Sequence, residues 1–141
     1  MTEIVINTVH GGFSVSVEAM KLLLEKRGKK TYFYARNLRK KSKEVYNKTP
    51  VEKIKKRFYY VFDKDMGDNI DWGESRLDDF VSDYDMPRDD KNLVAVVKEL
   101  GNKANGLCAE LKVVTIPDDV EWTIEEYDGL EWIAEKHRTW G

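Results

Sequence analysis

The segment at residues 120–140 constrains the fold more than any other part of the sequence. It reads VEWTIEEYDGLEWIAEKHRTW, so Asp128-Gly129 lies between two stretches in which apolar and polar residues alternate. A type I′ turn needs positive φ at both central positions, and Asp-Gly is a preferred pair for it. The segment therefore predicts a C-terminal β-hairpin, which follows a strand expected at residues 111–116.

The length of the chain, 141 residues, suits one domain with one core. Hydrophobic residues make up 41% and charged residues 35%, a balance typical of a globular protein with a charged surface. No apolar stretch approaches the ~20 residues of a spanning helix, and a strand begins almost directly after Met1 without a secretory signal. We therefore expect a cytoplasmic protein that does not bind membranes.

Few residues in the chain suit metal binding or nucleophilic chemistry. Cys108 is the only cysteine, which excludes an intramolecular disulfide, and its aliphatic neighbours favour a small buried side chain. His10 and His137 lack the spacing of a metal-binding pair. We expect no metal and no cofactor, and a noncatalytic protein is favoured over a hydrolase that uses His10 with a carboxylate.

Charges of opposite sign are segregated along the chain. Residues 21–60 hold 15 Lys/Arg against three Glu, and residues 63–90 hold 11 Asp/Glu against three Lys/Arg. Such asymmetry suits either two faces that attract each other in a homo-oligomer or a basic surface that an adjacent acidic surface keeps off nucleic acid. A solvated surface on which charges of one sign happen to cluster explains it equally well. The run KIKKRFYYVF at residues 53–62 interleaves cations with rings, as single-strand nucleic-acid binders do, but an ordinary core strand with Phe58 facing inward is favoured.

The periodicity of the chain predicts an α+β fold. Val17, Met20, Leu23 and Leu24 have helical spacing between a serine cap and Gly28. A second helix is expected at residues 92–100, with Asp89 or Asp90 as its cap and Gly101 as its end. A short helix should begin at Thr49-Pro50, with Thr as the cap. The expected strands are at residues 3–9, 31–35, 57–62 and 111–116 and in the hairpin.

These elements are expected to form a single domain over residues 1–141. It would consist of a mixed β-sheet with the C-terminal hairpin and two main helices on one face, with the first two strands parallel in a strand-helix-strand unit. Residues 36–48 and 63–85 are interpreted mainly as loops, and residues 36–87 as a variable charged insertion.

The turn between the first strand and the first helix is the strongest candidate for a binding site. It reads VHGGFS at residues 9–14, and glycines there would let the backbone approach a ligand while amides at the helix N-terminus favour an anion. A plain tight turn also explains it, since the motif is neither a dinucleotide fingerprint nor a Walker loop. The aromatic residues of the hairpin could contact a base or form core, and its carboxylates are expected mostly in water.

The C-terminal segment at residues 88–140 and the N-terminal INTVHGGFSVS resemble a family of small uncharacterised proteins encoded by bacteriophages and bacteria. The resemblance leaves out residues 36–87. It implies a phage or bacterial cytoplasmic setting, with a site shared between the glycine turn and the C-terminal segment.

We therefore predict a noncatalytic phage accessory protein, with an anti-defence role, that sequesters a small anionic, nucleotide-like ligand and so removes a host signal molecule. The predicted ligand-binding residues are His10, Gly11, Gly12, Phe13, Ser14, Ser16, Arg138 and Trp140. The alternative is an interaction protein that docks a host protein, or less favourably a nucleic acid, through its segregated charges.

Overall fold

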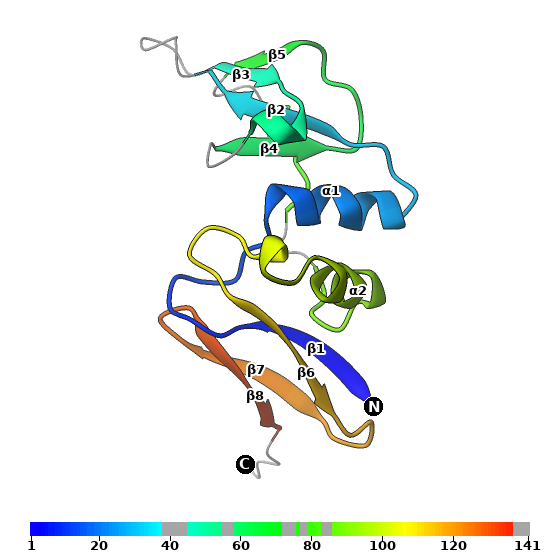
Figure 1. The fold of residues 1–141 in the computed structure, drawn as a ribbon, viewed down its shortest axis with the longest axis vertical. Helices are drawn as coiled ribbons and strands as arrows, with labels where there is room; N and C mark the ends of the chain where they lie inside the picture. Colours follow the sequence, from blue (N-terminus) through cyan, green and yellow to red (C-terminus); the bar gives the residue numbers. More distant parts are fainter. Residues whose placement is uncertain (38–44, 55–57, 72–75, 77–78, 83–85, 137–141) are drawn as a thin grey trace. The chain divides into compact units, whose positions relative to one another are not determined.

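The computed structural model describes the chain except for residues 38–44, 55–57, 72–75, 77–78, 83–85 and 137–141 (Figure 1). The described residues fall into two compact units. Unit 1 comprises Met1–Ala19 and Tyr84–Gly141, and unit 2 comprises Met20–Asp83. The helix α1 (Val17–Lys26) crosses the boundary in sequence.

Unit 1 is built on a pair of antiparallel strands covered by a helix. Strand β1 (Thr2–Asn7) pairs with β6 (Leu111–Ile116), and α2 (Lys91–Leu100) packs on both strands through its buried face. The Asp90 side chain accepts the Leu93 N–H at 2.9 Å, and Gly101, at a φ of 56°, ends the helix before the 3₁₀ turn η4 (Gly101–Ala104). Asp90 is one of the two caps that the sequence predicts, and Gly101 is the predicted stop.

The C-terminal hairpin of unit 1 consists of β7 (Trp122–Tyr127) and β8 (Leu130–Glu135). Its register places Tyr127 opposite Leu130, and the two residues between them, Asp128 and Gly129, have φ of 49° and 86°. The predicted hairpin and its two left-handed turn residues are therefore confirmed.

Unit 2 contains a four-stranded antiparallel sheet of order β4-β2-β3-β5. Its strands are β2 (Tyr32–Arg36), β3 (Val45–Lys48), β4 (Tyr59–Phe62) and β5 (Asn69–Asp71), with the 3₁₀ turn η1 (Val51–Lys53) before β4. The core of this unit is aromatic, because Tyr34, Tyr46 and Phe62 cluster with Met66 and Ile70.

The α+β class is confirmed: among the described residues two α-helices accompany eight strands. The strands form three antiparallel sheets, so the expected parallel pairing of the first two strands is wrong. One edge of β1 is taken by β6, and on the other edge the Val5 N–H donates to the Arg88 carbonyl at 2.9 Å. Strand β2 likewise has partners on both sides, so neither strand has an edge free for the other.

Two local expectations also differ from the structure. Residues 45–48 and 69–71, for which the sequence predicts loop, form β3 and β5. Strand β3 pairs with β2, and β5 pairs with β3, so backbone pairing forms strands in segments whose short sequences do not predict them. The turn η1 begins after Pro50, and the Thr49 hydroxyl donates backward to the Asn47 carbonyl at 2.7 Å and so caps no helix.

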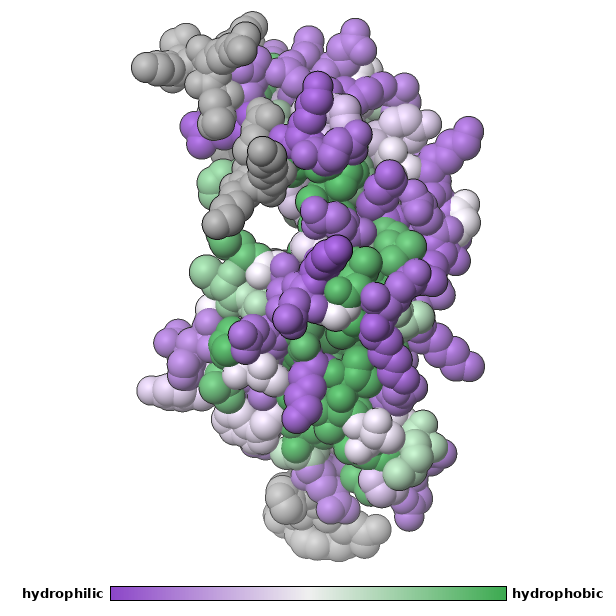
Figure 2. All heavy atoms as spheres, viewed as in Figure 1, coloured by the Kyte–Doolittle hydropathy of each residue, from purple (hydrophilic) through white to green (hydrophobic). Residues whose placement is uncertain are grey.

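Charged and polar side chains cover much of the face seen in Figure 2, with hydrophobic atoms showing between them, as a chain with 35% charged residues predicts. None of the helices in the described part of the chain has the length and apolar character that a membrane crossing requires.

Candidate functional site

Three turns meet at one end of unit 1. They are residues 10–12, 106–109 and 127–130, and we call this place the three-turn junction. A Cβ added to Gly129 would lie 2.2 Å from the Gly12 nitrogen, and one added to Gly11 would lie 2.6 Å from the Cys108 carbonyl oxygen. The Gly11 N–H donates to the Asp128 carbonyl at 3.3 Å. Glycine is needed here because backbones touch, so the turn at 10–12 holds the hairpin tip against the rest of unit 1.

The two serine hydroxyls of the predicted site bind neighbouring backbone. Ser14 Oγ donates to the Leu107 carbonyl at 3.3 Å. Ser16 Oγ donates to the Lys103 carbonyl at 2.6 Å and accepts the Ala19 N–H at 3.1 Å, which makes it the cap of α1. Both hydroxyls thus connect the glycine turn and the helix start to the segment at residues 103–107.

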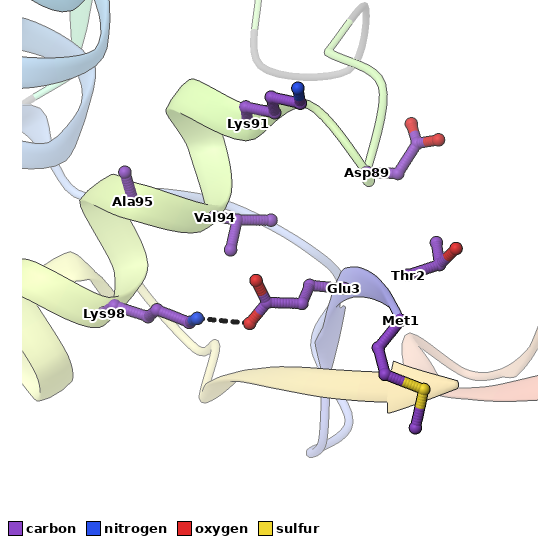
Figure 3. A pocket seen from close by; sticks show the side chains of 8 residues that line it. All are labelled: Met1, Thr2, Glu3, Asp89, Lys91, Val94, Ala95 and Lys98. Carbon is purple, nitrogen blue, oxygen red and sulfur yellow. Dashed lines mark ion pairs between the residues drawn. The ribbon is translucent and has the colours of Figure 1, made fainter. Parts of the chain in front are cut away.

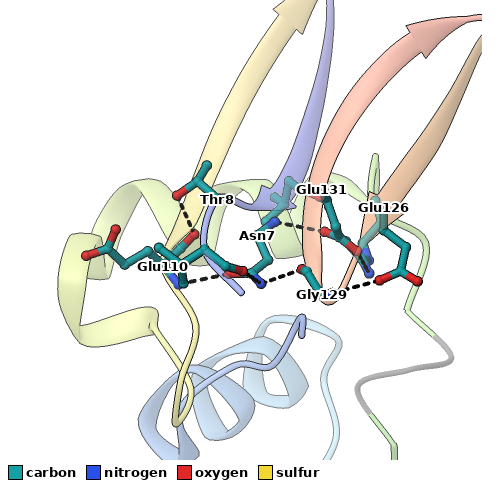
Figure 4. Close-up of polar contacts among 9 residues, drawn as sticks. Asn7, Thr8, Glu110, Glu126, Gly129 and Glu131 are labelled. Carbon is teal, nitrogen blue, oxygen red and sulfur yellow. Dashed lines mark hydrogen bonds and ion pairs between the residues drawn. The ribbon is translucent and has the colours of Figure 1, made fainter. Parts of the chain in front are cut away.

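Beneath the junction, the fully buried Asn7 joins three chain segments (Figure 4). Its Nδ2 donates to the carbonyls of Val9 at 2.6 Å and Gly129 at 2.7 Å, and its Oδ1 accepts the Glu110 N–H at 3.0 Å. Its backbone N–H donates to Glu131 Oε1 at 2.8 Å. Because a buried amide without partners is costly, this complete set of bonds specifies how the turns meet.

A buried ion pair continues this network. The Arg88 guanidinium donates to both carboxylate oxygens of Glu131, at 2.7 and 2.9 Å, and its Cζ lies 3.5 Å from the centroid of the buried Phe13 ring. The side chains of Arg88 and Glu131 are 21% and 8% exposed. The expectation that the hairpin carboxylates lie in water is therefore wrong for Glu131, which alternation places on the same face as Ile133.

His10 lies at the outer rim of the junction and is exposed. Its Nδ1 lies 3.2 Å from the Asp128 carbonyl oxygen, and its ring meets the Tyr127 ring edge-on with centroids 6.2 Å apart. The structure thus brings His10, Gly11 and Gly12 together with the hairpin tip. Of the other predicted residues in this segment, Phe13 packs against Arg88, and Ser14 and Ser16 bond the segment at residues 103–107. Arg138 and Trp140 lie outside the described residues, so the complete predicted ligand set stays a prediction.

The junction presents apolar side chains to solvent. Leu107 and Tyr127 are each 73% exposed, and Cys108 is exposed at a φ of 64°. The expectation that Cys108 is buried is wrong, because this residue occupies an exposed turn, of which the carbonyl and Cβ of Cys108 lie against Gly11. Sequence reasoning also missed Asn7 and Arg88, since an Asn at a strand end and an Arg before a helix carry no distinctive signal.

A concavity of unit 1, of about 390 Å³, lies between the start of β1 and one stripe of α2 (Figure 3). Its lining residues are Met1, Thr2, Glu3, Asp89, Lys91, Val94, Ala95 and Lys98. Lys98 forms an ion pair with Glu3 across it, so two of its charges neutralise each other. It shares no residue with the three-turn junction.

Unit 2 holds its own polar cluster around Tyr34. The phenol donates to the Gly67 carbonyl at 2.6 Å and accepts the Met66 N–H at 2.9 Å, and burial raises the pKa of Tyr34. Lys48 Nζ lies 2.7 Å from Asp65, and this hydrogen bond is the main cause of the lowered pKa of Asp65. The hydrogen bond that the Asp65 carboxylate accepts from the Gly67 N–H lowers the pKa further. These contacts hold the turn at residues 65–67 against the sheet.

The expectation that Phe58 faces inward, in the basic and aromatic run at residues 53–62, is wrong. Phe58 is 75% exposed and precedes β4, whereas Val61 and Phe62 are buried. Residues 55–57, which carry three of its cations, lie outside the described residues.

No protein-family model, curated protein sequence or solved structure matches this chain. The resemblance to phage and bacterial proteins therefore stays a prediction from the residues that carry it.

Proposed function

We propose that this chain is a noncatalytic interaction protein that docks a polypeptide partner at the three-turn junction of unit 1. One contrast carries the proposal. The polar groups of Ser14, Ser16 and Asn7 are bonded within the chain, whereas Leu107 and Tyr127 at the same junction are each 73% exposed. Exposed apolar and aromatic side chains on a rigid support are typical of an interaction surface.

The charge of unit 1 supports a basic partner. Residues 1–19 and 84–141 contain 15 Asp/Glu against seven Lys/Arg, and no Lys or Arg occurs between Asp118 and Glu135. Such a surface attracts a cationic protein and accelerates its association, an effect that salt weakens. The sequence resembles proteins encoded by bacteriophages and bacteria, so the partner would be a host protein in the bacterial cytoplasm.

Sequestration of a small anion is the second candidate, and one observation favours it. The Gly12 N–H has no hydrogen-bond partner among the described residues, and the exposed His10 ring lies two residues away. An anion bound there would accept the Gly12 N–H and contact His10, with Arg138 as the expected counterion.

The test is affinity capture from host cells with the wild-type chain and with the double variant Leu107→Ser/Tyr127→Ser. Both substitutions change exposed side chains, so the fold should persist, as circular dichroism and the unfolding midpoint would verify. The matched control is Phe58→Ser, which removes an equally exposed ring, 75%, from unit 2. We expect a partner that the wild type and Phe58→Ser retain and the double variant loses. Equal retention by all three would refute docking at the junction.

A further inference from the structure

The hairpin of unit 1 has one face turned inward and one turned to solvent. Its register pairs Trp122 with Glu135, Ile124 with Ile133 and Glu126 with Glu131 on the inner face, which includes the buried Glu131. The outer face carries Thr123, Glu125, Tyr127, Leu130, Trp132 and Ala134. Four of these six residues are apolar, so the solvated side of the hairpin is unusually hydrophobic.

The aromatic residues of the outer face are exposed in a fixed arrangement. Tyr127 is 73% exposed and Trp132 is 41% exposed. Trp132 Nε1 donates to Glu125 Oε2 at 3.2 Å across the two strands, which orients both side chains. A partner would therefore meet an ordered surface and would lose little side-chain entropy on binding.

Strand β7 also has an open edge. The Lys136 N–H donates to the Glu121 carbonyl at 2.8 Å, and with the hairpin register this places the backbone groups of Thr123 and Glu125 toward β8. The N–H and C=O groups of Trp122, Ile124 and Glu126 consequently point away from β8. In the described part of the chain β7 pairs with β8 alone, and neither Pro nor Lys protects its edge.

The charges along this edge are negative. Four carboxylates lie in β7, directly before it or in its turn, with no Lys or Arg among them: Glu121, Glu125, Glu126 and Asp128. Outer-face Glu125 stands between Thr123 and Tyr127, and inner-face positions 122 and 124 are apolar. A strand added beside β7 would thus find Glu125 between Thr123 and Tyr127 on the outer face, and Trp122 and Ile124 before Glu126 on the inner face.

We propose that β7 binds an extended segment of the partner as an added antiparallel strand, in which Lys or Arg alternates with apolar residues. This inference rests on the proposed function and names the kind of partner. The basic residues would lie on the outer face beside Glu125, and the apolar residues would lie opposite Trp122 and Ile124. Backbone hydrogen bonds supply affinity in such strand addition, and alternate side chains supply specificity.

The test measures binding of a fluorescein-labelled (Lys-Val)₄ peptide to the full chain by anisotropy. In the proposed register Val lies opposite Ile124, so the Val N–H groups bond to β7 and the Lys N–H groups point away. We therefore expect the peptide N-methylated on Val to lose binding and the one N-methylated on Lys to keep it. The oppositely charged (Glu-Val)₄ should not bind.

Two variants test the role of charge. Glu125→Gln keeps an acceptor for the Trp132 indole, so it should weaken (Lys-Val)₄ binding by about two- to fivefold, the size of an exposed ion pair. The control Glu135→Gln changes an exposed carboxylate on β8 and should leave binding unchanged.

Several outcomes would overturn the strand-addition proposal. They are failure of (Lys-Val)₄ to bind, equal binding of both N-methylated peptides, and sedimentation showing that a second copy of the chain occupies the edge. If (Lys-Val)₄ fails while Leu107→Ser/Tyr127→Ser still loses the captured partner, docking at the junction stands and only the strand-addition mode is wrong.

Discussion

Replacing Glu131 with Ala should be among the most destabilising single changes in unit 1. The Glu131 side chain, 8% exposed, accepts the Asn7 N–H and both ion-pair donors of Arg88. Removing one partner of a buried ion pair costs about 3–5 kcal/mol, and a buried N–H left without an acceptor costs about 1–3 kcal/mol. The two costs overlap, and the 21% exposed Arg88 side chain regains some water, so we expect a loss of about 4 kcal/mol in the free energy of unfolding.

Urea unfolding monitored by tryptophan fluorescence and by circular dichroism measures this loss, provided that the two transitions coincide. Glu131→Gln retains an acceptor for Asn7 and loses the charge, so it should cost about 2 kcal/mol. Glu135→Ala, an exposed change on the same strand, should stay within about 0.5 kcal/mol of the wild type. If Glu131→Ala were within about 1 kcal/mol of the wild type, the buried network would not hold the hairpin in place.

Three further substitutions, one of them a control, test the turns of the two units. Gly129→Ala combines a positive φ with a clash against the Gly12 backbone, so it should lower the free energy of unfolding by more than about 2 kcal/mol. The control Gly28→Ala also has a positive φ, but its Cβ would meet nothing within 4 Å, so it should cost only about 1 kcal/mol. Equal losses in urea unfolding would refute the close contact. The Lys48 hydrogen bond lowers the pKa of Asp65 below its ordinary 3.8, so its stabilisation is present above pH 3.8 and is lost as the pH falls through the lower folded-state value. Asp65→Asn should therefore weaken the acid dependence of unfolding, and unchanged profiles between pH 2 and 5 would contradict this role.

The features predicted correctly are those set by nearby residues. Asp128-Gly129 specifies its turn because both positions need positive φ, and Asp90 and Gly101 bound α2 because a helix end needs an acceptor and a left-handed stop. Each of these turn and cap preferences depends on residues close together in the sequence and not on the residues that pack around them.

The features that were missed depend on contacts between distant residues. The parallel pairing of the first two strands failed because Arg88, 83 positions from Val5, covers the free edge of β1. Glu131 becomes buried because Arg88 and Asn7 satisfy it, and no local pattern reveals such partners. The glycine turn was located correctly, but its role in backbone contact with Gly129 appears only once the hairpin folds back on it.

The proposal that unit 1 docks a polypeptide is tested most directly by native mass spectrometry of the protein purified from bacterial cells that express it. We predict a complex with a host polypeptide at fixed stoichiometry, which denaturation releases and which Leu107→Ser/Tyr127→Ser fails to form. A bare chain, or a chain that releases only a small anion, would contradict the docking account, and the anion would support sequestration at the glycine turn instead.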